Sequence, residues 1–435
     1  MNRRNTLEWR FVLALSASLL AACATTPLAR KPVTEKPLAE KLAPLEAFLQ
    51  QQVDAQKIPG AVVLVRRTDR EDVYFKAVGQ MDREKGRALP EDAIFRIASM
   101  TKPITSTAVM MLVDEGRLNL EDPISKYLPE WQSPRVLGTP DPSSPGGYQT
   151  VPAKTPITVK QLLTHTSGLS YRFWGDPLTP FYAQAGVTDG FEHTSKTLAA
   201  QSAALASVPL KHEPGTAFTY GLSTDVLGYL IEKVSGKPLD QFLQERLFQP
   251  LGMKDTHFFL PPEKVSRLPA LYRPTAAGRL ERVPETGASV KEGTASYAPD
   301  FHYAGSKSYL SGGAGLASTA SDYARFLQML ANGGELGGTR LLKKETVELM
   351  ARNQLGDLRS DIVKTFGLGF TVQDDPARTP QRGAVGTFSW SGIFRTTFWV
   401  DPEQKNLGVV MVNMWDLASD TPDDIRARIH ETLMQ

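Results

Sequence analysis

The stretch Ser99-Met100-Thr101-Lys102-Pro103, with the unbroken run 104–115 behind it, decides the fold of this chain. The run is apolar and reaches Gly116 without a helix breaker, which predicts a mostly buried helix that ends there. Proline is tolerated only in the first turn of a helix, so Pro103 places the helix start close to Ser99. Lys102 then shares a face with Ser99 at the positive end of the helix dipole.

This Ser-x-x-Lys arrangement carries chemistry as well as structure. A lysine beside a serine can take up the hydroxyl proton or stabilise its loss, which makes the serine a candidate nucleophile. The alternative is a serine that caps the helix beside a solvated lysine. Nucleophilic chemistry also needs a proton acceptor and an oxyanion hole, so the rest of the chain has to supply both.

The composition indicates an ordinary globular protein. The chain has 435 residues, of which 41% are hydrophobic and 22% charged, enough for one large or two closely packed domains. Its six histidines show no paired ligand spacing, so we expect no metal, and nothing indicates another cofactor. No Gly-x-Ser-x-Gly occurs, which argues against an α/β-hydrolase triad that would use His165.

The N-terminus has the features of an export signal. Three arginines precede the apolar run 11–22, and Leu20-Ala21-Ala22-Cys23 has the form of a bacterial lipobox. We therefore expect residues 1–22 to be a lipoprotein signal peptide, Cys23 to be lipidated, and residues 23–41 to be a tether. Cys23 is the only cysteine, which excludes an internal disulfide.

The mature chain is expected on the periplasmic side of the cell envelope, anchored in the outer membrane because Ala24 follows the cysteine. Residues 1–22 carry three arginines and one glutamate, so their removal leaves 46 side chains of each sign. Nothing in this balance indicates a nucleic-acid partner.

Strand patterns lie at both ends of the domain and helical patterns between them. Runs 60–67 and 73–80 predict a hairpin, and runs 366–372, 396–401 and 407–414 predict further strands. Residues 131–155, rich in Pro, Gly and Ser, are predicted to form a long loop. The expected fold class is α+β: an antiparallel sheet from about 42–100 and 310–435, flanked by helices at 42–53 and 423–433, with a mainly helical region at about 115–305 inserted.

Two further segments can complete a site around Ser99. Pro214 to Ser223 (PGTAFTYGLS) is a turn that presents Tyr220 just before a helix. Ser389-Trp390-Ser391-Gly392-Ile393 reads as a strand, and its glycine would let a ligand backbone approach closely.

Taken in order, these motifs resemble the serine β-lactamase and penicillin-binding-protein superfamily, in particular class C β-lactamases and family VIII carboxylesterases. The stretches 162–169 (LLTHTSGL) and 312–319 (GGAGLAST) resemble the same family. The resemblance covers about residues 42–433 and implies the β-lactamase/transpeptidase-like fold.

The resemblance also implies roles for residues. Ser99 would be the acylated nucleophile, Lys102 its partner, and Tyr220 the general base, while the N–H groups of Ser99 and Ile393 would form the oxyanion hole. His165 would be structural. The cleft wall and its substrate contacts would come from Trp390, Ser391, Gly392 and Ser223.

Two departures from the family pattern bear on the substrate. β-Lactamases of this type carry Tyr-x-Asn, but Gly221 and Leu222 follow Tyr220 here. They also carry Lys-Thr-Gly on the cleft strand, where this chain has Trp390. A flat apolar ring in place of a cation disfavours a substrate carboxylate and favours an uncharged ester. Arg395, three residues past Gly392, is the residue that could restore a cation.

We therefore expect a serine carboxylesterase that acts on a small-molecule ester through an acyl-enzyme, with weak β-lactam hydrolysis as a side activity. The alternatives are a D,D-peptidase or true β-lactamase, and an envelope sensor whose Ser99 is acylated without turnover. The aromatic cluster of Tyr171, Phe173, Trp174, Phe181 and Tyr182 either shapes selectivity or packs beneath the loop 131–155.

Overall fold

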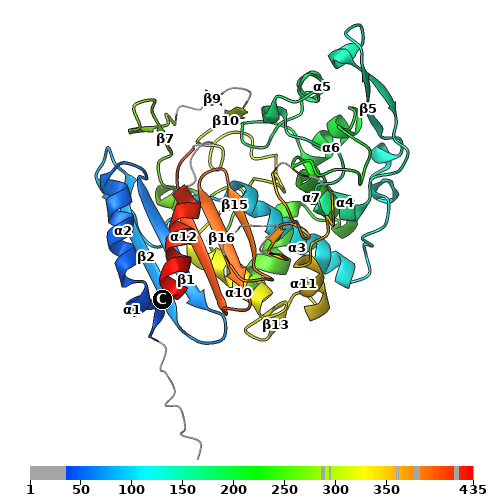
Figure 1. Cartoon of the computed structure of the whole chain (residues 1–435). Coiled ribbons are helices and arrows are strands. Elements are labelled where there is room, and N and C mark those ends of the chain that lie inside the picture. Colours follow the sequence, from blue (N-terminus) through cyan, green and yellow to red (C-terminus); the bar gives the residue numbers. More distant parts are fainter. Residues whose placement is uncertain are drawn as a thin grey trace, which may run out of the picture. The chain divides into compact units, whose positions relative to one another are not determined.

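The computed structural model describes residues 36–285, 290–292, 295–358, 360, 362–375, 383–415 and 421–434. Within them, an antiparallel sheet runs in the order β14-β15-β16-β17-β1-β2-β3, so strands from the two ends of the domain lie side by side (Figure 1). This confirms the predicted fold class. The strands are β1 Gly60–Arg67, β2 Val73–Asp82, β3 Arg87–Ala88, β14 Thr371–Val372, β15 Phe388–Gly392, β16 Thr396–Asp401 and β17 Asn406–Val412.

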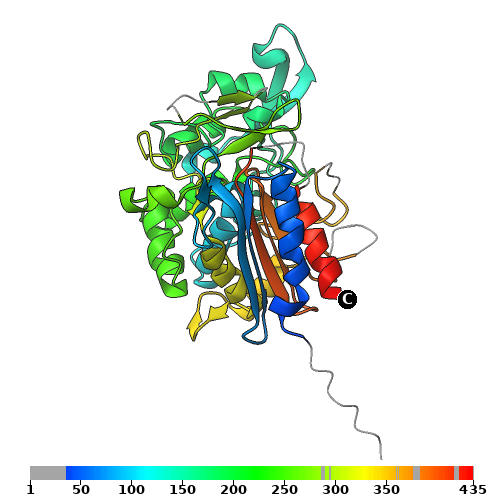
Figure 2. The ribbon, with the colours of Figure 1, turned by 90° about the vertical axis from the view of Figure 1, so that its left-hand side faces the viewer.

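The sheet is buried on both faces because side chains alternate along its central strands. In β1, Ala61, Val63 and Val65 pack against one hydrophobic cluster, whereas Val62 and Leu64 belong to another. Pairing of β1 with β17 in the register Val62↔Met411 keeps both alternations in phase. Helices from the two ends of the domain cover the first face (Figure 2). They are α1 Leu38–Lys41, α2 Ala43–Asp54 and α12 Thr421–Met434.

The second face carries α3 and α10, which belong to the larger cluster together with the inserted region. Helix α3 spans Thr101–Asp114, is preceded by a 3₁₀ turn at Ala98–Met100, and is buried from Thr101 to Leu112. Gly116 follows with φ 72°, the conformation in which glycine ends a helix. The helix predicted behind Ser99 is therefore confirmed, with Pro103 in its first turn. Helix α10 spans Ala320–Ala331, and α11 spans Lys344–Met350.

Between β4 (Phe95–Arg96) and β11 (Ala317–Ser318) the chain is mainly helical. Helix α7 packs against α3, α4, α6 and α8, which brings the inserted region onto the start of α3. The helices are α4 Val159–Leu163, α5 Thr179–Gln184, α6 Leu198–Ala206, α7 Ser223–Ser235, α8 Leu239–Leu243 and α9 Gln249–Leu251, with a π-helical turn at Gln244–Phe248 between the last two. Short strands complete it: β7 Tyr272–Pro274, β8 Leu280–Arg282, β9 Val290–Glu292 and β10 Ala295–Tyr297.

Two local predictions were wrong. Residues 131–155 contain a hairpin, β5 Arg135–Pro140 and β6 Tyr148–Pro152, because the Pro, Gly and Ser residues gather in its turn, where Asp141 accepts hydrogen bonds from Ser143 and Ser144. The strand predicted at 366–372 is only β14, since 366–370 are irregular and bent. Strands β12 Glu335–Leu336 and β13 Thr339–Arg340 form another short hairpin. The predicted signal peptide, and Cys23 with it, lie outside the described residues.

Candidate active site

Ser99 lies at the junction of the 3₁₀ turn and α3, where backbone N–H groups point out of the helix start. The residue is 9% exposed. The preceding residue, Ala98, has φ 42°, which is strained for a residue with a Cβ. Residues with such strained backbone angles are frequent at functional sites, where the surrounding structure imposes the conformation.

Lys102 has a fully buried side chain that reaches back to Ser99. Its Nζ lies 3.3 Å from Ser99 Oγ, 2.9 Å from the hydroxyl of Tyr171 and 2.9 Å from the carbonyl oxygen of Gly313. An ammonium group has three hydrogens to donate, and these three oxygens take all of them. The predicted serine–lysine pair is therefore in contact, and the position of the lysine is fixed from three sides.

Tyr171 is a neighbour of Lys102 that the sequence did not single out by role. It follows the stretch 162–169, which brings it beneath the start of α3, and it is 1% exposed. Burial raises the pKa of the Tyr171 hydroxyl well above its usual range. Tyr171 is therefore a neutral phenol that holds Lys102 and cannot serve as a base near neutral pH.

Tyr220 lies on the other side of the lysine and is half-buried. The Lys102 ammonium lies 4.6 Å from the centre of the Tyr220 ring, over its face. Within the described part of the chain, the Tyr220 hydroxyl has no hydrogen-bond partner although it is buried. The structure thus brings Ser99, Lys102 and Tyr220 together and leaves the Tyr220 oxygen open to a reacting group, for which its ionised form would be the base.

His165 fixes the backbone on both sides of Tyr220. Its carbonyl oxygen accepts the N–H of Thr219 at 2.8 Å, and its Nδ1 accepts the N–H of Gly221 at 3.4 Å. The His165 ring also lies 4.8 Å from the Tyr220 ring. Burial lowers the pKa of His165 well below its usual range, so the ring is neutral. This agrees with a structural role for His165.

Gly221 and Leu222 show why the chain departs from Tyr-x-Asn. A Cβ on Gly221 would lie 2.4 Å from the carbonyl oxygen of Leu169 and 2.5 Å from the Cα of Ser170, so no side chain fits. Leu222 is fully buried in the large core cluster. The position of the family's asparagine therefore faces the core and offers no amide to a substrate.

Strand β15 carries the predicted cleft wall. The Trp390 ring is half-buried and lies 5.3 Å from both the Tyr220 ring and the Phe366 ring, while Ser391 is exposed. The N–H of Ile393 makes no hydrogen bond within the described residues, as an oxyanion-hole donor would require. Trp390 thus lies against the candidate base, and Ile393 has an N–H to offer.

Gly392 allows a close contact within the protein, whereas the sequence predicts one with a ligand. A Cβ on Gly392 would lie 2.3 Å from the carbonyl oxygen of Ile97, so the glycine lets β15 pack against the turn that carries Ser99. Sequence reasoning assigned this glycine to the approach of a ligand backbone. The structure assigns it to the approach of the protein's own chain.

The predicted substrate contact of Ser223 does not fit its position. Ser223 is fully buried at the start of α7, and its Oγ lies 2.9 Å from the Oγ of Ser167. It is an internal polar contact between α7 and the loop after α4. Arg395 is half-buried in the turn between β15 and β16, with φ 63° and its N–H bonded to the carbonyl oxygen of Gly392.

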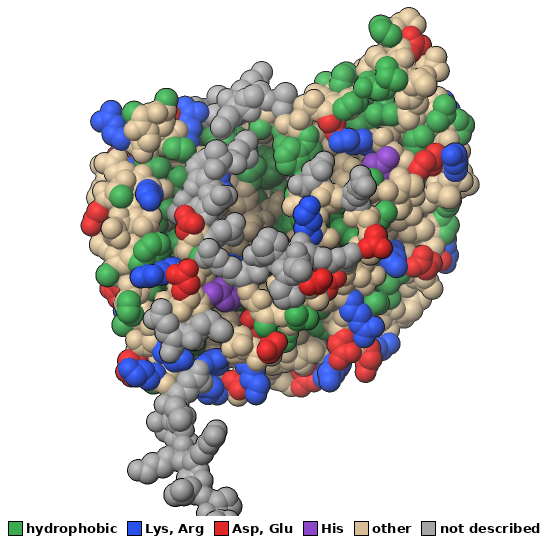
Figure 3. Space-filling model, in the orientation of Figure 1, with side chains coloured by type: hydrophobic (Ala, Val, Ile, Leu, Met, Phe, Trp, Pro, Cys, Tyr) green, Lys and Arg blue, Asp and Glu red, His purple; other side chains and the backbone are tan. Residues whose placement is uncertain are grey.

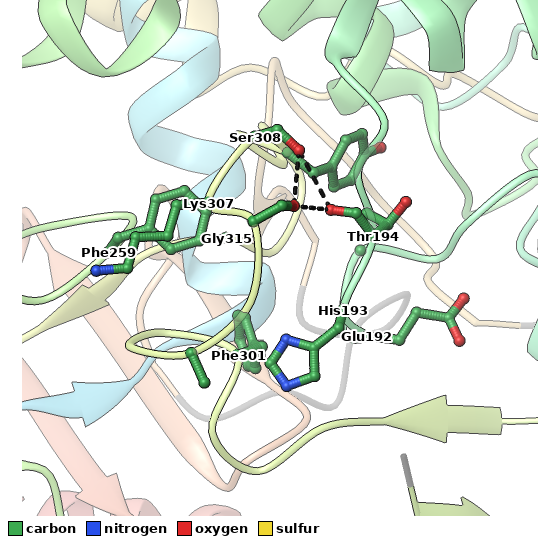
Figure 4. A pocket seen from close by; sticks show the side chains of 12 residues that line it. Glu192, His193, Thr194, Phe259, Phe301, Lys307, Ser308 and Gly315 are labelled. Atoms are coloured by element: carbon green, nitrogen blue, oxygen red, sulfur yellow. Dashed lines mark hydrogen bonds between the residues drawn. The ribbon is translucent and has the colours of Figure 1, made fainter. Parts of the chain in front are cut away.

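Figure 3 shows a hollow with hydrophobic side chains on its wall, over the region where Figure 1 places the ends of β15 and α3. A separate small pocket lies between His193, Phe301 and Phe259, where Ser308 donates to the carbonyl oxygen of Thr194 (Figure 4). Its volume of about 20 Å³ has room for a water molecule but not for an ester. Among the described residues, no group of His, Cys, Asp or Glu side chains could hold a metal ion.

Comparison with known proteins gives consistent matches. The family model described as Beta-lactamase matches residues 45–432. Esterase EstB of Burkholderia gladioli is 33% identical over 379 residues, covering 83% of this chain and 88% of that protein. A putative D-alanyl-D-alanine carboxypeptidase of Escherichia coli K12 is 29% identical, covering 94% of this chain and 90% of that protein. The solved structure of EstCE1, a hydrolase with promiscuous acyltransferase activity, is 30% identical with a TM-score of 0.76, covering 92% of this chain and 98% of that one.

Proposed function

The chain belongs to the beta-lactamase family, and from that premise we propose that it is a serine carboxylesterase that hydrolyses small uncharged esters through an acyl-enzyme. The observation that carries the proposal is the contact between Ser99 Oγ and the fully buried Lys102 Nζ. A buried ammonium beside a hydroxyl at a helix start stabilises the negative charge that the serine develops when it attacks.

Acylation follows from the positions of these residues. Tyr220 first loses its phenol proton to solvent, and the nearby Lys102 charge stabilises the phenolate. Ser99 Oγ then attacks the ester carbonyl carbon, and its proton passes to the phenolate oxygen of Tyr220. The carbonyl oxygen becomes an oxyanion that the N–H groups of Ser99 and Ile393 stabilise. The intermediate then breaks the bond to the alcohol oxygen, which takes the proton from Tyr220 and leaves as the alcohol.

Deacylation repeats these steps with water. Tyr220 removes a proton from the water as it attacks the acyl carbonyl carbon, and the Ser99 oxygen takes that proton back when the acid leaves. No step requires a group from outside the chain besides the ester and water.

The substrate class is inferred from the two family positions that this chain changes. Trp390 stands where the family has a lysine that meets a carboxylate, and Leu222 is buried where the family has an asparagine. A desolvated carboxylate without a partner costs on the order of a few kcal/mol. Hydrolysis of uncharged esters is therefore favoured, and the name of EstB, an esterase, supports the same substrate class.

A second candidate is a D,D-peptidase or β-lactamase activity, which the similarity to the putative D-alanyl-D-alanine carboxypeptidase supports. This activity requires a cation for the carboxylate of the peptide or the antibiotic. Arg395 is the candidate cation, three residues past Gly392. Relative rates on esters and on β-lactams separate the two functions.

Export and lipid attachment form part of the proposal and rest on residues 1–35 of the sequence. Cys23 would carry the lipid and hold the enzyme on the periplasmic face of the outer membrane. Among the described residues, no helix is long and apolar enough to span a bilayer. Labelling of cells with radioactive palmitate tests the anchor, because the Cys23→Ser variant would then remain unlabelled and appear in the soluble fraction.

The acyl-enzyme is tested by mass spectrometry of residues 24–435 mixed rapidly with p-nitrophenyl butyrate. We expect a butyryl group on the peptide that contains Ser99, followed by its loss as the substrate is consumed. A stable adduct after a single stoichiometric burst would identify the acylatable sensor instead. Absence of any adduct on Ser99 would overturn the proposed function.

A further inference from the structure

The buried Lys102 ammonium donates its hydrogen bonds to neutral groups only. Its three hydrogen-bond partners, Ser99 Oγ, the Tyr171 hydroxyl and the Gly313 carbonyl oxygen, carry no formal charge. Burying a charge without a counter-charge is costly, and a lysine in that position tends to give up its proton. A nearby carboxylate is therefore needed if Lys102 is to stay protonated.

Asp225 is a buried carboxylate beside this site. It lies in the first turn of α7, five residues after Tyr220, and is 1% exposed. Its Oδ1 accepts hydrogen bonds from the Tyr309 hydroxyl at 2.9 Å and from Ser311 Oγ at 2.7 Å. These two hydroxyls fix the orientation of the carboxylate, while Oδ2 lies beside Gly313, whose backbone N–H also favours the charged form.

Gly313 shows that Asp225 Oδ2 and the Lys102 ammonium face the same space. A Cβ on Gly313 would lie 2.6 Å from Asp225 Oδ2, 3.4 Å from Lys102 Nζ and 3.4 Å from the Tyr171 hydroxyl. Only a residue without a side chain leaves that space open. The carboxylate and the ammonium are thus close neighbours across Gly313, and the Lys102 charge acts on Asp225.

We propose that Asp225 is a positioning residue that acts through Lys102: its buried carboxylate is the counter-charge that keeps the ammonium protonated and directed at Ser99. The side-chain hydrogen bonds of Asp225 go to Tyr309 and Ser311, so its effect on Ser99 would pass through Lys102. The inference rests on the proposed function, because it assumes that Ser99 is the nucleophile. Its consequence is that Lys102 has no capacity to accept the Ser99 proton, which goes to Tyr220.

Other titratable groups surround the pair and bear on any pH profile. The phenols of Tyr171, Tyr220 and Tyr309 face it, and Asp189 and His165 lie within electrostatic range. Burial raises the pKa of Asp225, whereas the Ser311 hydroxyl, the Lys102 charge, the Tyr309 hydroxyl and the Gly313 N–H lower it. Burial also raises the pKa values of Tyr171 and Tyr309 well above the usual range, so both stay neutral.

The first test compares Asp225→Asn with Asp189→Asn. Both change a buried aspartate to an isosteric amide, but Asp189 is paired with Arg172 and binds the Arg172 N–H. We expect Asp225→Asn to shift the alkaline fall of kcat/KM for a p-nitrophenyl ester to lower pH by about one unit or more. The rate on the alkaline side should drop about tenfold or more with little change in KM, while Asp189→Asn leaves the position of this fall nearly unchanged.

The second test keeps the carboxylate and removes the two hydroxyls that favour its charged form. In the double variant Tyr309→Phe, Ser311→Ala, ionisation of Asp225 requires a higher pH. We therefore expect the acid limb of kcat/KM to move to higher pH. If a thermal melt shows that Asp225→Asn does not fold, the double variant still tests the role of Asp225.

The outcomes separate this inference from the proposed function. A folded Asp225→Asn protein with an unshifted alkaline limb would overturn the role of Asp225, even if its melting temperature falls. If that variant does not fold, an unshifted acid limb in the double variant would overturn it. A wild-type protein without Ser99-dependent ester hydrolysis would instead contradict the proposed function, and that control is run first.

Discussion

The ammonium nitrogen of Lys102 lies 2.9 Å from the hydroxyl of Tyr171, whereas it lies over the ring of Tyr220 rather than against its hydroxyl. Two tyrosines therefore flank the lysine in different ways. Tyr171 is buried, hydrogen-bonded and neutral, whereas the Tyr220 hydroxyl has no hydrogen-bond partner in the described part of the chain. This difference assigns the support of the lysine to Tyr171 and the proton transfer to Tyr220.

Replacing each tyrosine with phenylalanine tests that assignment. Tyr220→Phe removes the proton acceptor and should lower kcat about 10³-fold or more, since general acid–base catalysis contributes about 10² to 10⁴. Tyr171→Phe removes one hydrogen bond to the lysine and should cost about tenfold. The measurement is kcat on p-nitrophenyl butyrate. A larger loss for Tyr171→Phe than for Tyr220→Phe would reverse the roles.

His165 should act on the position of Tyr220 and not as an acid or base. His165→Ala removes the ring beside Tyr220 and the acceptor of the Gly221 N–H, and it places alanine at φ 54°. We expect kcat to fall about tenfold to 100-fold and the melting temperature to drop. The pH profile between about pH 6 and pH 9 should keep its shape, because burial keeps His165 neutral throughout. Loss of a titration step in this range would show that His165 ionises in the mechanism.

Gly221 should tolerate no side chain. The Cβ of Gly221→Ala would meet the backbone of Leu169 and Ser170, which cannot rotate away. We expect a loss of unfolding free energy of about 1–3 kcal/mol or more, together with a displaced Tyr220 and low activity. Gly278→Ala is the matched control, because it meets no atom within 4 Å and carries only the strain of φ 72°. Equal effects of the two substitutions in urea unfolding would contradict the predicted clash.

Asp189 should make stability depend on pH in the acidic range. Burial raises the pKa of Asp189 to about 6, so the folded protein keeps the proton where the unfolded chain has lost it. This proton stabilises the folded protein by about 3 kcal/mol below about pH 4. That stabilisation is lost as the pH rises through about 6. The unfolding free energy of Asp189→Asn minus that of the wild type should therefore rise between these pH values and then level off. A flat or falling difference would contradict the raised pKa.

Trp390 should control the choice between neutral and anionic substrates. Trp390→Lys places a cation on β15 and should raise the rate on nitrocefin relative to p-nitrophenyl butyrate by about tenfold to 100-fold, the usual worth of a hydrogen bond to a charged group. Trp390→Leu removes the ring without adding charge and should lower the ester rate alone. An unchanged ratio of the two rates in Trp390→Lys would show that this position does not meet the substrate.

The sequence predicts the part of the fold that local patterns determine. Pro103 and Gly116 mark the two ends of α3, and alternation in 60–67 and 407–414 predicts the central strands. The hairpin at 135–152 was missed because turn-forming residues dominate the composition of that stretch, while its pairing depends on contacts such as Val136 with Leu210. Such long-range contacts leave no local periodicity.

In the candidate site, too, the sequence predicts the residues that lie in local motifs and misses those that long-range packing positions. Ser99, Lys102 and Tyr220 lie in recognisable motifs, and the structure brings them together. Tyr171 and Asp225 are positioned by tertiary packing, and nothing in their neighbouring residues distinguishes them from core side chains. Ser223 is the converse case: a polar residue near Tyr220 in sequence whose side chain faces the interior.

The most direct test of the central claim is the initial rate of residues 24–435 on p-nitrophenyl butyrate and on nitrocefin, beside the Ser99→Ala variant. The account predicts a much larger rate on the ester, lost when Ser99 is replaced. A dominant rate on nitrocefin would contradict it, because it would require a cation, with Arg395 the first candidate, to take the place of the missing lysine.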